Sequence, residues 1–162
     1  MENKQYKDNM NKTEQIIKRS VDFVIAACCL IFFSPLAIAC AIAIRLEDGL
    51  PVIYRQERIG LHGKPFFIYK FRSMKVNEEA DYKQATADDP RKTRFGDFLR
   101  RSNIDELPQF INVFKGDMSI VGPRPHMLAH TETYARLIDK YMVRHFIKPG
   151  VTGWAQTHGF RG

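Results

Sequence analysis

The sequence has few cysteines and lacks the common phosphate-binding glycine motifs, and each absence excludes a class of protein. Its three cysteines all lie between residues 28 and 40, in one apolar run. An odd number of thiols so close together cannot form the disulfide framework of a small secreted domain. The Cys/His spacings of zinc sites and the G-x-x-x-x-G-K-[ST] and G-x-G-x-x-G motifs are also missing. We therefore expect reduced thiols, no zinc ribbon, and neither a Walker nor a Rossmann phosphate site.

Charge is absent from residues 23–44, and no other segment is comparably apolar. As one helix this run would be roughly 33 Å long, enough to cross the hydrocarbon core of a membrane. It starts too late and is too long for a cleavable signal peptide. Ser34-Pro35 lies near its midpoint, where a proline removes a backbone donor and disfavours helix at the preceding residue. The sequence therefore predicts a break in the middle of the run.

Three interpretations of this run remain open from composition alone: a re-entrant helix-break-helix hairpin, a spanning helix with a proline kink, and a buried helix of a soluble protein. Basic residues precede the run (Lys18, Arg19) and follow it (Arg45, Arg58), so both flanks have the character of cytoplasmic segments. We divide the chain into an amphipathic interfacial helix (1–22, capped by Thr13), a membrane hairpin (23–46) and a cytoplasmic catalytic domain (47–162).

The cytoplasmic part is expected to combine short strands with short helices. Two β-prone runs, 51–55 and 66–71, are separated by Gly60 and Gly63, which predicts a β-hairpin. Apolar spacing predicts two short helices at 95–99 and 107–114 and a third amphipathic helix near 134–142. Residues 122–125 are interpreted as a rigid connector. The expected fold class is α+β, mainly helical, with a membrane hairpin and a compact catalytic domain.

Two adjacent acids, Asp105 and Glu106, are the most informative polar residues. Pro108 fits best in the first turn of a helix, so we expect the helix to begin near Ile104 or Asp105. The backbone donors and dipole of that terminus would favour ionised carboxylates. An ionised, rigid Asp105 is a candidate nucleophile, and an adjacent Glu106 is a candidate Mg²⁺ ligand. The plainer interpretation is that both residues only cap the helix.

Basic residues accompany the two acids and favour a phosphate-binding function. They are Arg100, Arg101, Arg124, Lys70 and Arg72, in a chain with a net charge of +7. Guanidinium groups suit phosphate oxygens, so their convergence would indicate a diphosphate site.

Other candidates are weaker. His126 and His130 have metal-ligand spacing but no supporting motif, so a structural role is preferred. Core packing is the preferred interpretation of Trp154, and Cys28, Cys29 and Cys40 are interpreted as small apolar residues.

Several motifs, in one order, resemble those of the bacterial sugar transferase family, the monotopic polyprenyl-phosphate sugar-1-phosphate transferases. They are KRSVDF (18–23), Ser34-Pro35, YRQERIG (54–60), YKFRSM (69–74), DELPQ (105–109), NVFKGDMSIVGPRP (112–125) and KPGVTGWAQ (148–156). The resemblance implies transfer of a sugar-1-phosphate from a UDP-sugar to undecaprenyl phosphate, with release of UMP. It implies a re-entrant membrane helix in the bacterial inner membrane and a catalytic domain on the cytoplasmic face. The transfer would be the first step of exopolysaccharide, capsule or O-antigen synthesis.

The same resemblance implies roles for individual residues. Asp105 would be the nucleophile that becomes phosphoglycosylated, and Glu106 would bind Mg²⁺. Arg100 and Arg124 match basic positions expected to hold phosphate, followed by Lys70 and Arg72. The closing GWAQ segment suggests glucose or galactose as the sugar. An early end at Gly162 suggests a C-terminally truncated catalytic domain.

The alternative function is a catalytically silent membrane module that binds acidic lipid or a polysaccharide-assembly partner. A membrane-tethered nucleic-acid binder would use the same positive charge, but no helix-turn-helix or RNP-like pattern accompanies it. We therefore expect an anionic bilayer and no nucleic acid as partners, and leave a homodimer open.

Overall fold

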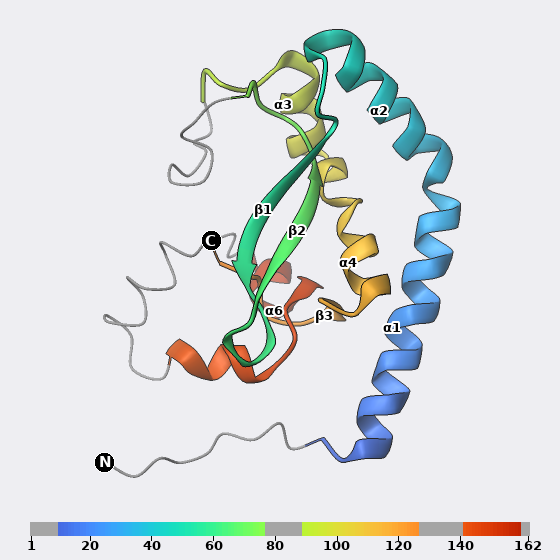
Figure 1. The fold of residues 1–162 in the computed structure, drawn as a ribbon, viewed down its shortest axis with the longest axis vertical. Coiled ribbons are helices and arrows are strands. Elements are labelled where there is room, and N and C mark those ends of the chain that lie inside the picture. The colour runs from blue at the N-terminus through green and yellow to red at the C-terminus, as the bar shows by residue number, and fades with distance from the viewer. Residues whose placement is uncertain (1–9, 77–88, 127–140, 160–162) are drawn as a thin grey trace.

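Two long helices form one side of the molecule, and the shorter elements pack against them (Figure 1). The computed structural model describes residues 10–76, 89–126 and 141–159, the side chains of 141–143 excepted. Helices α1 (Lys12–Phe32) and α2 (Ser34–Asp48) follow each other along this side as a bent rod. The mixture of helices with a small antiparallel hairpin agrees with the predicted α+β class.

A capping box begins α1. The Glu14 backbone N donates to Asn11 Oδ1 at 2.9 Å, and the Asn11 backbone N donates to Glu14 Oε2 at 2.9 Å. The prediction that Thr13 caps this helix is therefore wrong. Asn11 takes that position because Glu14 stands three residues after it, the spacing that a reciprocal capping box requires. The helix runs without interruption through residues 22 and 23.

The apolar run breaks at Phe33, directly before Ser34-Pro35. The two helices are bent by 59° relative to each other, and Pro35 lies in the first turn of α2. Pro35 has no backbone donor, which costs little at that position. The Ser34 hydroxyl donates to the Ile31 carbonyl at 2.8 Å and satisfies one acceptor at the end of α1. Within the described residues neither helix alone is long and apolar enough to cross a membrane, but the bent pair together meets that criterion.

The predicted β-hairpin is present. Strands β1 (Ile53–Ile59) and β2 (Pro65–Phe71) pair antiparallel, and the short 3₁₀ helix η1 (Leu61–Gly63) joins them. Tyr54 lies opposite Lys70 in the register. Ile68 and Phe71 are buried, each in a different apolar cluster.

Three short helical elements follow the hairpin in sequence. Helix α3 (Arg94–Arg101) is capped by Thr93, whose hydroxyl accepts from the Gly96 backbone N at 2.9 Å. A 3₁₀ turn, η2 (Ile104–Glu106), leads into α4 (Gln109–Lys115), which ends at Gly116 with φ 97°. The expected helical start at Ile104 is found, but as a 3₁₀ turn, and the α-helix proper begins only after Pro108.

A parallel pair of strands was not expected from the sequence. Strand β3 (Ser119–Val121) pairs with β4 (Gly150–Thr152), and the turn-rich segment near residue 150 therefore contains a strand. Parallel pairing joins distant segments and leaves no local signal in the sequence. The centre of the third predicted helix, near residue 134, lies outside the described residues. A 3₁₀ helix η3 (Tyr141–Phe146) and a short α6 (Trp154–Thr157) flank β4.

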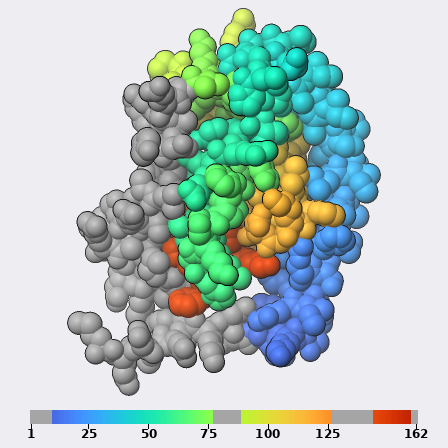
Figure 2. All heavy atoms as spheres, in the orientation of Figure 1, coloured from blue at the N-terminus to red at the C-terminus, as the bar shows by residue number. Residues whose placement is uncertain are grey.

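Two apolar clusters hold the hairpin between the helices. The first joins α1, β2 and α4 through Ala26, Ile68 and Val113, together with Met118. The second joins α2, β2 and α3 and consists of Cys40, Ile44, Phe71 and Leu99. Figure 2 shows α4 filling the space between the hairpin and α1. Because β2 contributes to both clusters, its position is determined from both ends of the helix pair.

Candidate active site

Asp105 is a buried residue whose carboxyl forms no hydrogen bond or ion pair with the residues that the structure describes. It lies in the η2 turn that connects α3 to α4, and the residue is 8% exposed. Asn103, with φ 57°, takes the left-handed conformation that lets the chain turn sharply just before η2. Across the part of the chain that the structure describes, no hydrogen bond or ion pair reaches this carboxyl, and no side chain caps η2 or α4. The plainer interpretation, in which Asp105 serves as a helix cap, therefore has no geometric support.

Burial raises the pKa of Asp105 above its ordinary value, and the adjacent Glu106 charge adds to the increase. The positive charges of Lys70, Arg100 and Arg124 oppose it. The expectation that a helix terminus would stabilise the ionised form is therefore wrong for this residue, because desolvation exceeds the attraction of its basic neighbours. Three of the predicted phosphate-binding residues nevertheless act electrostatically on Asp105.

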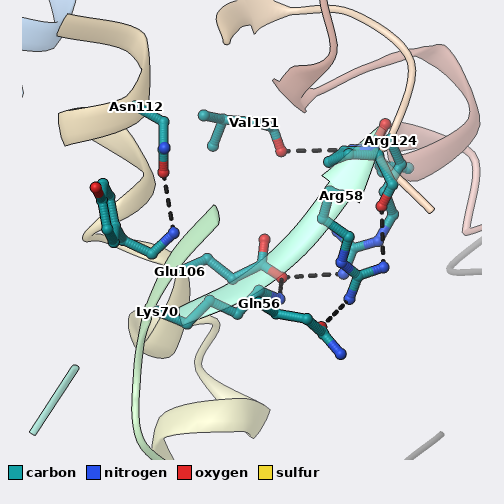
Figure 3. A network of polar contacts seen from close by, with 10 residues as sticks. Gln56, Arg58, Lys70, Glu106, Asn112, Arg124 and Val151 are labelled. Atoms are coloured by element: carbon teal, nitrogen blue, oxygen red, sulfur yellow. Dashed lines mark hydrogen bonds and ion pairs between the residues drawn. The ribbon is translucent and has the colours of Figure 1, made fainter. Parts of the chain in front are cut away.

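Glu106 is the centre of an ion-pair cluster (Figure 3). Lys70 Nζ lies 2.7 Å and Arg124 Nη2 lies 3.0 Å from the same carboxylate oxygen, Oε1. Burial disfavours the charge of Glu106, but the two cations and their hydrogen bonds outweigh it and lower the pKa to about 2. The surroundings of the two adjacent acids thus shift their pKa values in opposite directions, upward for Asp105 and downward for Glu106.

The hairpin supplies Lys70. This residue lies on β2 next to the buried Phe71, and its side chain is 20% exposed. Desolvation lowers the pKa of Lys70, although the negative charges of Glu106 and Asp105 raise it in compensation. The ion pair joins two residues that are 36 positions apart in sequence.

Arg124 is held on a loop that several contacts position. Arg144 donates to the backbone carbonyl of Arg124, and Arg58 Nη1 donates to the Pro125 carbonyl oxygen at 3.2 Å. Arg58 also donates to Gln56 Oε1, so β1 supports the loop (Figure 3). From the sequence, Arg58 was expected only to be a positive charge beside the apolar run, although its position in the YRQERIG motif was a signal of a further role. No local signal pointed to Arg144.

Arg72 does not reach the two acids. Its Nη2 donates to the carbonyl oxygens of Asp48 (2.7 Å) and Gly49 (3.0 Å) and lies 3.2 Å from Asp48 Oδ2. The structure therefore corrects its predicted phosphate-binding role: Arg72 is buried and ties the hairpin to the end of α2. The backbone leaves the strand after Phe71, and the nearest unsatisfied carbonyls are those at the C-terminus of α2.

An open pocket of about 290 Å³ adjoins the ion-pair cluster. It is lined by Asn103, Glu106, Leu107, Phe110, Arg124, Val151, Thr152, Gln156 and Thr157. Apolar side chains and hydroxyl or amide groups therefore meet beside one carboxylate and one guanidinium. A larger hollow of about 490 Å³ lies elsewhere, around the start of α3, but there Asp89 pairs with Arg91 and Asp97 with Lys92. Only the smaller pocket touches the predicted site residues.

The two carboxyl groups fit a magnesium ion that a phosphate ligand helps to bind. In the described residues no cluster of three or more His, Cys, Asp or Glu side chains could hold a metal by itself. Mg²⁺ usually takes only one or two protein carboxylates and completes its shell with phosphates and water. The hydrogen bonds to Glu106 from described residues go to Oε1, which leaves Oε2 as the oxygen that could bind the ion.

Three weaker candidates have different outcomes. Trp154 is 81% exposed and stacks on His158 with ring centroids 4.2 Å apart, so the prediction of core packing is wrong. Cys40 packs in the second apolar cluster as a small apolar residue, as predicted. His126 contacts Arg144, and His130 lies outside the described residues, so the structure does not test them as a metal-binding pair.

Comparison with known proteins identifies related chains. The family model for the bacterial sugar transferase matches residues 13–162. A UDP-glucose:undecaprenyl-phosphate glucose-1-phosphate transferase of Escherichia coli is 52% identical, over 97% of this chain and 34% of the relative. A UDP-N-acetylgalactosamine-undecaprenyl-phosphate N-acetylgalactosaminephosphotransferase of Aeromonas hydrophila is 47% identical, over 89% of this chain and 34% of the relative.

A third relative is closer to this chain in length. The exopolysaccharide production protein PSS of Rhizobium leguminosarum is 41% identical, over 91% of this chain and 76% of the relative. The chain therefore spans about a third of the first two relatives and about three quarters of the third.

Proposed function

This chain belongs to the bacterial sugar transferase family, and we propose that it transfers a sugar-1-phosphate from a UDP-sugar to undecaprenyl phosphate and releases UMP. The names of two relatives support this reaction. The single structural observation that carries the proposal concerns Asp105. It is buried, it forms no hydrogen bond or ion pair with the described residues, and it directly precedes Glu106, which pairs with two cations. A buried acid kept free of protein partners is suited to act on a substrate.

The reaction proceeds in two displacements. A carboxylate oxygen of Asp105 attacks the sugar-side phosphorus of the donor, and the bond from that phosphorus to the UMP oxygen breaks. An oxygen of undecaprenyl phosphate then attacks the same phosphorus and displaces Asp105, whose carboxylate is restored. A covalent intermediate of this kind divides one exchange between two anionic substrates into two steps and produces ping-pong kinetics.

The basic residues stabilise the charge that develops. Arg124 and Lys70 already face Glu106, and Arg100 acts on Asp105, so a diphosphate near these acids meets three positive charges. Placed in a partly desolvated site, such cations stabilise a phosphoryl transition state more strongly than they would in water. Mg²⁺, held by Glu106 with Asp105 beside it, would supply further charge compensation at the diphosphate.

The uncharged part of the donor fits the pocket beside the ion pair. Arg124 and Glu106 form its charged wall, and Thr152 and Gln156 present hydroxyl and amide groups to it. Glucose or galactose remains the proposed sugar, and the name of the Escherichia coli relative favours glucose. We place the reaction at the start of exopolysaccharide, capsule or O-antigen synthesis, in keeping with the name of the Rhizobium relative.

The α1 and α2 pair is the proposed membrane anchor, inserted as a re-entrant hairpin from the cytoplasmic face of the bacterial inner membrane. Large apolar side chains near the bend are exposed, among them Ile31 at 75%, Phe32 at 76% and Ile38 at 61%. An apolar surface of this kind is stable against lipid rather than water. Basic residues beside it would each contribute roughly 1 kcal/mol to binding an anionic leaflet. Tags fused at Met1 and Gly162 should both be accessible from the cytoplasm.

The test is UMP release from a panel of UDP-sugars by the detergent-solubilised chain with undecaprenyl phosphate and Mg²⁺. Asp105→Asn should abolish release, whereas Asp97→Asn, the same chemical change in a surface ion pair, should retain it. With a labelled donor and no acceptor, label should remain on the wild-type protein and be absent from Asp105→Asn. Equal release from Asp105→Asn would refute the mechanism, and no release by a folded wild-type chain with any donor would favour the silent module.

A further inference from the structure

We propose that Asp22 on α1 is a positioning residue for Arg124, so that the proposed membrane helix sets the geometry of the phosphate site. The inference rests on the proposed function for its kinetic test, and it has a second test that needs no activity. Nothing in the reaction itself uses Asp22, which the sequence presents only as part of the KRSVDF motif.

The Asp22 side chain is tied to β3. The residue is 5% exposed, and its Oδ1 accepts hydrogen bonds from the Ser119 hydroxyl at 3.1 Å and from the Ile120 backbone N at 3.0 Å. Lys18, one turn earlier on α1, donates from Nζ to Ser119 Oγ at 2.6 Å and lies 3.6 Å from Asp22 Oδ2. A buried carboxylate with several donors is a strong and directional attachment, because leaving any of its partners unsatisfied is costly.

A tightly packed connection leads from β3 to Arg124. The Gly122 backbone N donates to the Thr152 carbonyl oxygen at 2.9 Å, and the Gly150 backbone N donates to the Pro123 carbonyl oxygen at 3.0 Å. A Cβ on Gly122 would lie 2.3 Å from the Lys148 carbonyl oxygen, so the two strands approach more closely than any other residue would allow. Proline on both sides of Arg124 restricts its backbone further. A shift of β3 is therefore passed on to Arg124.

The same turn of α1 also holds the segment that carries the two acids. Arg19 donates from Nη1 to the Val113 carbonyl oxygen and from Nη2 to the Phe114 carbonyl oxygen, each at 2.7 Å. These carbonyls belong to the last turn of α4, where helix carbonyls lack partners in the next turn. The Val113 carbonyl also accepts from the Gly116 backbone N at 3.0 Å. Since η2 precedes α4, one turn of α1 holds both Glu106 and its partner Arg124.

The kinetic test is a double-mutant cycle in the full chain. Asp22→Ala should lower kcat/KM by about 10-fold to 100-fold, the size expected when a binding group is misplaced by about an ångström. In an Arg124→Ala background the same change should have an effect of less than about 3-fold, because Asp22 acts through Arg124. Asp22→Asn keeps an acceptor for the Ile120 N–H and should recover part of the loss. Equal, additive losses in both backgrounds would refute the proposal.

The matched control is Asn11→Ala, which removes the cap of the same helix far from β3. It should lower the Tm of the protein, because the helix loses its cap, and leave kcat/KM within about 2-fold of wild type. If Asp22→Ala does not fold, Ser119→Ala replaces it, since this milder change breaks the bridge to Lys18 but keeps the Ile120 hydrogen bond.

The second test measures Arg124 directly. In a chain labelled with ¹⁵N-arginine, the Arg124 side-chain N–H signal is assigned by its loss in Arg124→Ala. That signal should shift in Asp22→Ala and stay unchanged in Asn11→Ala. An unchanged signal would overturn the proposal, even if the protein were less stable. If wild-type chain releases no UMP, the proposed function fails while this measurement still decides the role of Asp22.

Discussion

Replacing Glu106 by glutamine should destabilise the protein in a way that depends on pH. The ordinary pKa of this carboxyl is 4.5, and Lys70 and Arg124 lower it to about 2 in the folded state. Because one pKa unit corresponds to about 1.4 kcal/mol, the charged form of Glu106 contributes about 3 kcal/mol to stability at neutral pH. Its side chain is only 18% exposed, so solvent screening removes little of this contribution.

The sign of the pH dependence follows from linkage. A lowered pKa in the folded state means that the unfolded chain binds the proton more readily, so stability is present above the unfolded pKa, near 4.5. It is lost as the pH falls toward about 2. The difference between wild type and Glu106→Gln should therefore be largest at pH 7, decrease below about pH 4.5, and approach its pH-independent remainder near pH 2.

The assay is thermal unfolding in detergent, followed by circular dichroism from pH 7 down to pH 3. A loss of about 3 kcal/mol corresponds to a Tm lower by about 6–12 °C for a chain of this size. Glu57→Gln, the same change at an exposed position on β1, should alter the free energy of unfolding by less than about 0.5 kcal/mol. Equal stability of wild type and Glu106→Gln at pH 7, or a difference that does not vary with pH, would show that the ion pair does not stabilise the fold.

Other substitutions separate catalysis from stability. Asp105→Asn should raise stability at pH 7 in thermal unfolding while abolishing UMP release, because a desolvated carboxylate is removed. The acid limb of the kcat/KM profile should lie above pH 3.8, since burial raises the pKa of Asp105. Arg100→Ala should move this limb to higher pH, because the Arg100 charge lowers the same pKa. An acid limb that Arg100→Ala leaves in place would contradict this prediction. Arg72→Ala should lower stability by about 3 kcal/mol through loss of its buried contacts to Asp48, while kcat/KM of the folded enzyme changes less than about 3-fold. Gly96→Ala should prevent stable folding, as judged by size-exclusion chromatography, because its Cβ would lie 2.0 Å from the Ser73 carbonyl oxygen.

The local elements were predictable because their signals are local. Pro35 is tolerated only in the first turn of a helix, so the apolar run breaks directly before it. Gly116 ends α4 because glycine adopts positive φ without strain. Alternating β-prone runs around Gly60 were sufficient for the hairpin. The family was also evident, since seven short motifs in a single order are far more specific than any one of them, and the family model confirms it.

The site itself was predicted only in part. The adjacency of Asp105 and Glu106 is a sequence fact, and Lys70, Arg100 and Arg124 were correctly placed in their vicinity. The prediction for Arg72 was wrong. Strand β2 stops at Phe71, so Arg72 lies in different surroundings from Lys70, only two residues before it.

By itself, then, the sequence determined the family, the chemical types in the site, the break in the apolar run and the β-hairpin. Only the tertiary structure decided which charges meet and how dry their surroundings are. Glu106 pairs with residues 36 and 18 positions away, and Asp105 is buried in η2, which packs against α3 and β2. The order of residues in the sequence does not show how far apart two side chains lie in the fold, or how much water reaches them. Two neighbouring carboxyls of similar chemistry therefore have pKa values shifted in opposite directions.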